Sequence, residues 1–254
     1  MKEQIITSKS NSLIKEFAKL KNKKYRLKSN LVILEGKRII SDAISRGINL
    51  KALFILDDVK DKYLPLFKDV ECNLFITSKP AYENLSDTVN SQGVIAIAEI
   101  SNNSFDIPKT NFLVLDNISD PGNMGTIIRT AVACGFNYIY TFNCVDVFNE
   151  KVLRSTMGTI FDAKIINVDL SQISVLAESF EVFAADMNGK DVFTHKIQSP
   201  IFGIVMGNEG NGLTTQIKNL CKKIVSLPMQ NGVESLNVSV ACAVLMYVLK
   251  NNQN

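Results

Sequence analysis

Histidine is almost missing from this chain of 254 residues, since His195 is the only one. A Ser-His-Asp triad needs a histidine as its base, and many metal sites are built on several histidines. His195 lies in Phe-Thr-His-Lys-Ile, where we expect a structural or exposed side chain. The sequence therefore argues against a hydrolytic triad and predicts no metal site.

Nucleotide-binding fingerprints are also missing. No G-x-G-x-x-G follows the first expected strands, and G-x-x-x-x-G-K-[ST] occurs nowhere. The dinucleotide-binding and P-loop interpretations of an α/β chain thus lose their main support.

The chain lacks the marks of secretion or membrane insertion. Its start has no apolar core of a signal peptide, and its longest apolar run, residues 238–249, is too short to span a bilayer. The cysteines are odd in number and form no C-x-x-C pair; they are Cys72, Cys134, Cys144, Cys221 and Cys242. This usage fits reduced thiols, and we expect a cytoplasmic protein with no membrane partner.

Charge is distributed unevenly along the chain. Residues 1–100 hold 17 Lys and Arg against 12 Asp and Glu, and residues 101–254 hold 11 against 13. Within residues 1–30 there are nine basic residues and two acidic ones, with Tyr25 available for stacking on a base. Two interpretations stay open: a surface that attracts a phosphate backbone, or a solvated basic face with no partner.

Alternating strand and helix patterns divide the chain near residue 104. Before that point the patterns predict strands at 31–34, 52–56, 74–77 and 93–100 and helices at 10–20, 37–46 and 81–85. Residues 101–110 are polar and have the composition of a linker. We therefore predict a small α/β domain over residues 1–104 and a second domain over residues 105–254.

The second domain continues the alternation. Strands are expected at 112–115, 138–142, 164–168, 182–185, 201–206 and 224–225, and helices near 123–131, 152–161, 175–180 and 238–249. Such alternation is typical of a mainly parallel sheet, which binds ligands at the carboxyl ends of its strands. The loops after Leu115, Met206 and Leu227 are therefore candidates for one shared site.

Two of these loops carry residues with more than one interpretation. Glycines after Met206 would let the backbone approach a ligand closely, although a turn alone also explains them. Ser235 and Asn237 precede a helix that is apolar on every side, as in a large core or a subunit interface. Either residue could cap that helix or bind a ligand.

Three segments stand out by their order and spacing. They read Asp-Pro-Gly-Asn-Met-Gly-Thr-Ile-Ile-Arg-Thr-Ala at 120–131, Met-Gly-Asn-Glu-Gly-Asn-Gly-Leu at 206–213, and Leu-Pro-Met-Gln-Asn-Gly-Val-Glu-Ser-Leu-Asn-Val-Ser-Val-Ala at 227–241. Together they resemble the three motifs of the SpoU (TrmH) family of RNA ribose 2′-O-methyltransferases. Residues 1–100 also look like that family's substrate-binding domain, so the resemblance implies that the small α/β domain over residues 1–104 binds RNA. Gly122 and Asn208 replace the more common histidine and serine or alanine, which removes no proposed catalytic group.

The resemblance implies a SPOUT fold for the C-terminal domain. In that fold a mainly parallel sheet carries a trefoil knot that binds S-adenosylmethionine, and two copies pack through the knot helices. A homodimer of this kind suits the apolar helix after Asn237. The implied activity is methylation of a ribose 2′-OH in structured RNA.

The resemblance also assigns residues to roles, carried over by position. The cofactor-binding positions are Met206, Gly207, Leu227, Met229 and Leu236. The catalytic positions are Arg129, Asn123, Glu209, Ser235 and Asn237. Simpler explanations stay open for some of them: a surface salt bridge for Arg129, and local turn or cap bonds for Asn123 and Glu209.

In the expected reaction a ribose 2′-oxygen attacks the methyl group of S-adenosylmethionine in line. The usual family assignment makes the arginine the base, yet a guanidinium keeps its proton in proteins. We therefore predict that Arg129 is the cation that stabilises the forming alkoxide and binds a substrate phosphate.

The preferred substrate is 23S ribosomal RNA, because a separate globular N-terminal domain resembles the rRNA-directed branches of the family. Transfer RNA is the alternative substrate. A further alternative is an RNA-binding protein that keeps the fold without activity, against which the intact Arg129, Glu209, Ser235 and Asn237 speak.

Overall fold

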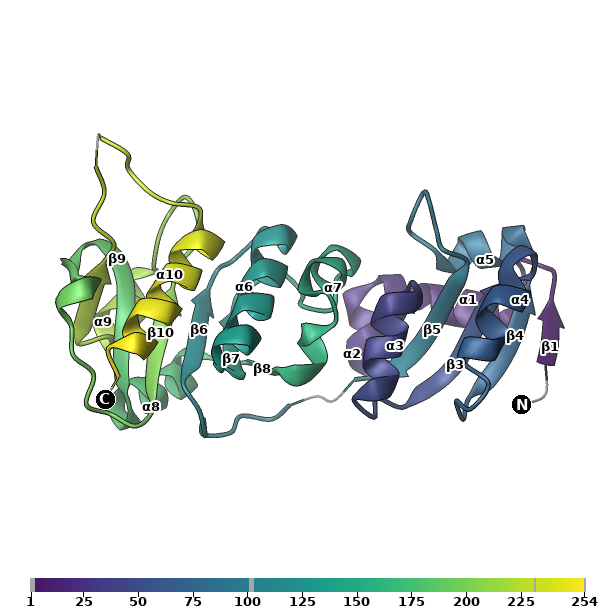
Figure 1. Cartoon of the computed structure of the whole chain (residues 1–254), viewed down its shortest axis with the longest axis horizontal. Coiled ribbons are helices and arrows are strands. Elements are labelled where there is room, and N and C mark those ends of the chain that lie inside the picture. Colours follow the sequence, from purple (N-terminus) through teal and green to yellow (C-terminus); the bar gives the residue numbers. More distant parts are fainter. Residues whose placement is uncertain (1–2, 101–102, 231, 254) are drawn as a thin grey trace. The chain divides into compact units, whose positions relative to one another are not determined.

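The computed structural model describes residues 3–100, 103–230 and 232–253. The chain divides into two compact units (Figure 1). Unit 1 holds residues 1–102 and 148–161, and unit 2 holds residues 103–147 and 162–254. Each unit is built on one β-sheet. The order of the chain does not reveal that residues 148–161 group with the first unit.

Unit 1 contains a five-stranded sheet in the order β1-β4-β3-β5-β2. The strands are β1 Glu3–Ile6, β2 Leu31–Glu35, β3 Leu50–Leu56, β4 Asn73–Thr77 and β5 Val94–Glu99. β4 pairs in parallel with β1 and β3, whereas β5 is antiparallel to β2 and β3. The carboxyl ends of these strands therefore lie at both ends of the sheet.

Helices cover both faces of this sheet (Figure 1). α1 (Ser12–Ala18) and α5 (Lys79–Leu85) lie over one face, and α3 (Lys37–Ser45) and α4 (Lys60–Tyr63) over the other. The helical stretch continues after α1 with η1 (Lys19–Lys21) and α2 (Lys23–Ser29), and α7 (Glu150–Thr156) also belongs to this unit. Under α1 and α5 the core contains Ile14, Leu20, Phe54, Phe75 and Tyr82.

Unit 2 contains a six-stranded sheet in the order β11-β9-β10-β6-β7-β8. The strands are β6 Phe112–Asp116, β7 Tyr138–Phe142, β8 Lys164–Asn167, β9 Glu181–Asp191, β10 Phe202–Met206 and β11 Lys223–Ser226. Every neighbouring pair is parallel, as predicted from the alternation of strands and helices. All six carboxyl ends therefore lie at one end of the sheet.

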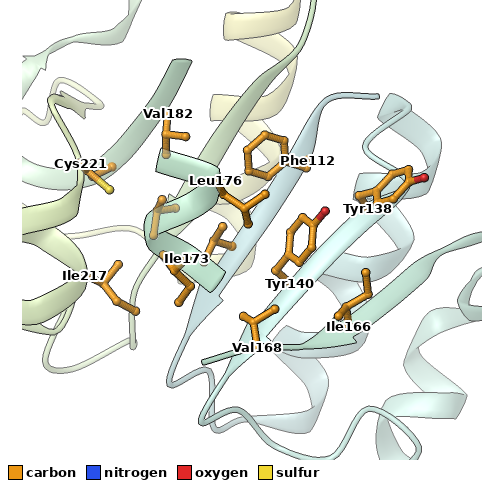
Figure 2. Packing of buried hydrophobic residues seen from close by; sticks show 13 residues of the cluster. Phe112, Tyr138, Tyr140, Ile166, Val168, Ile173, Leu176, Val182, Ile217 and Cys221 are labelled. Carbon is orange, nitrogen blue, oxygen red and sulfur yellow. The ribbon is translucent and has the colours of Figure 1, made fainter. Parts of the chain in front are cut away.

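Two helix layers enclose this second sheet. α6 (Pro121–Cys134) and α10 (Val238–Asn251) pack against each other, and α8 (Leu170–Ser179) and α9 (Thr215–Leu220) form another layer. Figure 2 shows Ile173 and Leu176 of α8 among Phe112, Tyr140 and Val182 of the sheet. The β-branched and aromatic residues of the strands fit such a pleated, buried surface.

Several element boundaries differ from the sequence-based expectations. The helix expected near 123 begins at Pro121, because Asp120 caps it and proline suits a first helical position. β9 is much longer than the expected 182–185, and its register against β11 jumps from Ala184 to Lys190. The expectations missed β1, α2, α4 and α9, which are short or contain few apolar residues.

The last helix begins where expected but is not buried on every side. Asn237 is its N-cap and accepts hydrogen bonds from the backbone N–H groups of Ser239 and Val240. One stripe is open to solvent in the single chain: Val240 is 48% exposed and Tyr247 is 55% exposed. None of the described helices has the length and apolar content needed to cross a membrane.

Candidate active site at the carboxyl ends of β6 and β10

The centre of the unit 2 sheet is a topological switch point. From β6 the chain proceeds outward through β7 and β8, whereas β10, β9 and β11 lie on the other side of β6. In open parallel sheets, ligands bind at the carboxyl ends of the strands beside such a point. β6 ends at Asp116 and β10 ends at Met206, so the topology places the candidate site in the loops that follow these residues.

The loop after β10 closes on itself. The backbone N–H of Asn208 donates to the carbonyl of Gly212 at 2.9 Å, and the N–H of Gly212 donates back to the carbonyl of Asn208 at 3.0 Å. A Cβ at Gly207 would lie 2.3 Å from the carbonyl carbon of Gly212, closer than any real contact. Glycine at 207 is therefore required by the chain's own packing, whereas Gly212, with φ +65° and open space around it, leaves room for another molecule.

One residue from each of the three motifs joins a single hydrogen-bond network. The side-chain amide of Asn123 on α6 donates to Oε1 of Glu209 at 2.9 Å. The amide of Asn237 donates to Oδ1 of Asn123, also at 2.9 Å. These partners are 86 and 114 positions apart in the chain. The expected convergence of the three segments is therefore present in unit 2.

Capping and network bonding occur together at two of these residues. Asn123 donates its backbone N–H to the capping Asp120 at 2.7 Å, which leaves its side chain for Glu209 and Asn237. Asn237 caps α10 with Oδ1 and uses Nδ2 for Asn123. Because Asn123 donates to a carboxylate, its oxygen must face Asn237, and the network fixes the orientation of both amides.

Arg129 lies outside this network. It is exposed on α6, six residues beyond Asn123, which is about 9 Å along the helix axis. No ion pair or hydrogen bond joins its guanidinium to another described residue. The surface salt bridge considered from the sequence is therefore absent from the described part of the chain, and the charge stays available.

The loop between β11 and α10 carries the remaining expected site residues. Ser235 is exposed and makes no hydrogen bond to another described residue, so it does not cap α10. The apolar side chains of Met229 and Leu236 are also exposed, and Leu227 is half-buried. Within the described part of this loop one backbone hydrogen bond is present, from the N–H of Val233 to the carbonyl of Gln230.

Asp116 is a site residue that the sequence analysis missed. It is fully buried at the end of β6, where Oδ2 accepts the backbone N–H of Thr214 at 2.7 Å and Oδ1 accepts the side chain of Asn117 at 2.8 Å. Asn208 in turn donates to the carbonyl of Asn117 at 2.9 Å. A carboxylate directly after a buried strand was the available signal, and here it ties the two loops of the switch point together.

The nearby thiol has no place in the chemistry of this site. Cys144 lies beside the end of β6, and its Sγ is 3.2 Å from the carbonyl oxygen of Leu115. Burial raises the pKa of Cys144 to about 11, so the thiol stays protonated at neutral pH.

Comparisons with known proteins agree with this geometry. The SpoU rRNA methylase family model matches residues 110–247, and the model of an MRM3-like substrate-binding domain matches residues 11–96. The 23S rRNA (guanosine(2553)-2′-O)-methyltransferase RlmP of Bacillus subtilis (strain 168) is 29% identical over 248 residues, which cover 96% of this chain and 98% of that protein.

Solved structures share the whole architecture. The AdoMet-bound rRNA methyltransferase from Sinorhizobium meliloti superposes with a TM-score of 0.85 at 24% identity, covering 98% of each chain. The SpoU methyltransferase AviRb from Streptomyces viridochromogenes, in complex with AdoMet, gives a TM-score of 0.84 at 24% identity, over 94% of this chain and 96% of that one. These likenesses confirm the fold class, an α/β N-terminal domain followed by a SpoU-type domain on a parallel sheet. The chain belongs to the SpoU rRNA methylase family.

Proposed function

We propose that this protein transfers a methyl group from S-adenosylmethionine to a ribose 2′-hydroxyl of 23S ribosomal RNA. The observation that carries the proposal is the network of Asn123, Glu209 and Asn237, which joins the three family motifs at the switch point of the sheet. The name of the Bacillus subtilis relative, which matches nearly the full length of both chains, supports the choice of 23S rRNA.

Residues around the carboxyl ends of β10 and β11 fit the cofactor. Met206 ends β10 and Gly207 follows it, and Leu227, Met229 and Leu236 belong to the loop after β11. In this loop, exposed apolar side chains lie next to backbone groups that make few hydrogen bonds within the chain. Such a surface suits a ligand with a flat apolar ring and a polar tail. When bound, S-adenosylmethionine supplies a methyl group activated by its sulfonium.

Charge stabilisation is the main task of the protein's own residues in this reaction. The guanidinium of Arg129 binds a substrate phosphate and stabilises the negative charge that develops on the 2′-oxygen. The proton of the hydroxyl passes to a phosphate oxygen, water or a neighbouring group, because Arg129 keeps its own proton. Asn123, which Asn237 holds in place, fixes the orientation of Glu209, and Ser235 has a free hydroxyl for the substrate.

A homodimer through unit 2 is part of the proposal, as are a trefoil knot and a cytoplasmic location. The exposed stripe of Val240 and Tyr247 on α10 supports the dimer, because such a face is costly to leave in water. α10 packs against α6, which carries Arg129, so an interface on this stripe would adjoin the catalytic helix. Scattered thiols without a C-x-x-C pair support the cytoplasmic location.

The test is a methyl-transfer assay with labelled S-adenosylmethionine and unmodified transcripts. We expect incorporation into 23S rRNA and none into a tRNA pool, with the label on a 2′-oxygen. Mapping 2′-O-methyl groups in cells with and without the protein identifies the nucleotide. Calorimetry with S-adenosylmethionine separates an enzyme from a pure RNA binder, because only the enzyme gives a binding isotherm. Absence of both binding and methyl transfer would refute the proposal.

A further inference from the structure

We propose that unit 1 holds the RNA substrate on one particular surface, formed by α1, η1 and α2, which we name the α1–α2 face. The inference rests on the proposed function and assigns a location to its RNA contact. Phosphates bind exposed lysines of this face, and a base stacks on Tyr25.

The first argument is unpaired positive charge. Residues 12–29 contain seven Lys and Arg and one acidic residue. The six lysines among them are exposed: Lys15, Lys19, Lys21, Lys23, Lys24 and Lys28. Lys21 forms an ion pair with Asp87 at 2.7 Å, whereas the other five have no carboxylate partner among the described residues. Exposed cations without partners are free to replace the counterions of an RNA backbone.

The second argument is the spacing of these lysines on the helices. Lys15 and Lys19 lie four residues apart, and so do Lys24 and Lys28. Residues four apart are neighbours on one helix face, so each pair concentrates two like charges at one place. Such repulsion costs stability in the free protein, and a bound phosphate chain relieves it.

The third argument is apolar surface among the lysines. Tyr25 is 42% exposed and Leu27 is 54% exposed. The ammonium of Lys19 lies 5.9 Å from the centre of the Tyr25 ring. An aromatic ring next to cations is the usual arrangement for stacking a single-stranded base beside its phosphate.

Arg26 has a different part, although it belongs to the same basic run. Its side chain is only 7% exposed, and its guanidinium donates to the carbonyl oxygens of Leu20 and Lys21 at 2.6 and 2.8 Å. It therefore holds the turn between η1 and α2 in place. The lysines contact RNA, whereas Arg26 fixes the helices that carry them.

The helix layer on the opposite face of the unit 1 sheet includes an acidic stretch, in contrast to the basic α1–α2 face. Residues 57–71, which include α4, contain five acidic residues and three lysines. One of those lysines, Lys60, already pairs with Asp57 at 2.9 Å. This layer should repel RNA, so its exposed Lys62 and Lys68 provide a matched control for lysines of the α1–α2 face.

The experiment measures binding of the full-length protein to an unmodified 23S rRNA transcript at several salt concentrations. The double variant Lys24→Ala/Lys28→Ala should bind about 10- to 100-fold more weakly, and the slope of log affinity against log salt should fall by roughly 1.5 to 2. Lys62→Ala/Lys68→Ala should leave both quantities unchanged. Equal effects of the two double variants, or no change in slope for the first, would overturn the proposal.

Tyr25 is tested separately by a conservative pair. Tyr25→Ala should weaken binding roughly 5- to 150-fold without changing the salt slope, because stacking involves no counterion release. Tyr25→Phe keeps the ring and should restore the affinity. Loss of affinity in both variants, or in neither, contradicts a stacking role.

A failure of this proposal is distinguishable from a failure of the proposed function. The wild-type protein is assayed in parallel for methyl transfer to the same transcript and for S-adenosylmethionine binding by calorimetry. If it methylates the transcript while the variants of the α1–α2 face bind RNA normally, the enzyme assignment stands and the RNA contact lies outside the α1–α2 face. If the face binds the transcript but no methyl transfer occurs, the activity fails and the surface assignment stands.

Discussion

The two units share a layered α/β construction but place their polar chemistry differently. In unit 2 all neighbouring strands are parallel, so every carboxyl end lies at one end of the sheet, where Asp116, Asn123 and Glu209 are hydrogen-bonded. In unit 1 β5 is antiparallel to its neighbours, and the notable charges lie on helices outside the sheet. A fully parallel sheet brings the loops that follow its strands to one end, where they can form one site. In the mixed sheet of unit 1 these loops are divided between two ends, and the charged residues lie on the helices that cover the sheet.

The largest expected effect is on the chemistry proposed for unit 2 alone. Arg129→Ala removes the charge proposed to stabilise the alkoxide, and we expect methyl transfer to fall by about 1000-fold or more. Affinity for S-adenosylmethionine should stay nearly unchanged, as measured by calorimetry. Lys222→Ala removes another exposed cation of unit 2 and serves as the control with normal activity. Substantial turnover by Arg129→Ala would show that the site works without this residue.

A smaller effect is expected from the network itself. Asn123→Asp replaces the amide that donates to Glu209 with a carboxylate, which repels it. The resulting misorientation of Glu209 should lower the methyl-transfer rate about 10- to 100-fold, while RNA affinity at unit 1 is retained. Asn219→Asp makes the same chemical change at an exposed position of α9 and should have no effect. An active Asn123→Asp enzyme would mean that the network is only structural.

Asp116 tests how the two loops of unit 2 are held together. Asp116→Asn places an NH2 group against a hydrogen-bond donor. The free energy of unfolding should fall by about 1–3 kcal/mol, because a buried group loses its partner. Amide hydrogen exchange should accelerate in β6 and β10 and stay unchanged in the strands of unit 1. Asp191→Asn, at an exposed cap, is the control. Equal acceleration in both units would indicate one cooperative fold instead of two.

The smallest effect concerns the ion pair of Asp186 and Lys218, which are 2.6 Å apart in unit 2. Burial by itself raises the pKa of Asp186, but the hydrogen bonds from Lys218 and the N–H of Asn188 outweigh it, and the net pKa lies below the usual 3.8. The stabilisation is therefore complete above that pH and is lost as the pH falls through the lower folded value. We expect this ion pair to contribute about 0.5–1 kcal/mol to the free energy of unfolding at neutral pH. Urea unfolding of wild type and Asp186→Asn should differ at pH 7 and converge as the pH falls through the lowered folded pKa of Asp186.

Apolar runs predicted most of the fold because they report burial directly. Strands such as Tyr138–Phe142 have the expected bounds, since four of the five residues in this strand are buried between the two helix layers. The second half of β9, Asn188–Asp191, is polar and was missed because it pairs at the exposed end of the sheet. The grouping of residues 148–161 with unit 1 depends on tertiary contacts that no local pattern records.

The site was predictable in part. The family motifs indicated Asn123, Glu209 and Asn237, yet their hydrogen bonds join positions far apart in sequence and could not be read from spacing. The buried Asp116 was missed because the sequence alone does not show that the carboxylate at the end of this strand is buried. The roles of Arg129, Ser235 and the cofactor-binding positions stay predictions, since each depends on contacts with RNA or cofactor and not on contacts within the chain.

The closed loop after β10 has a thermodynamic consequence for ligand binding. Two reciprocal backbone hydrogen bonds between Asn208 and Gly212, with no Cβ at Gly207 to force them apart, hold this turn before any ligand arrives. The free energy of ordering it is therefore already included in folding, and a molecule that docks against it loses little affinity to conformational entropy. Substituting Gly207 by alanine would shift that cost from folding to association.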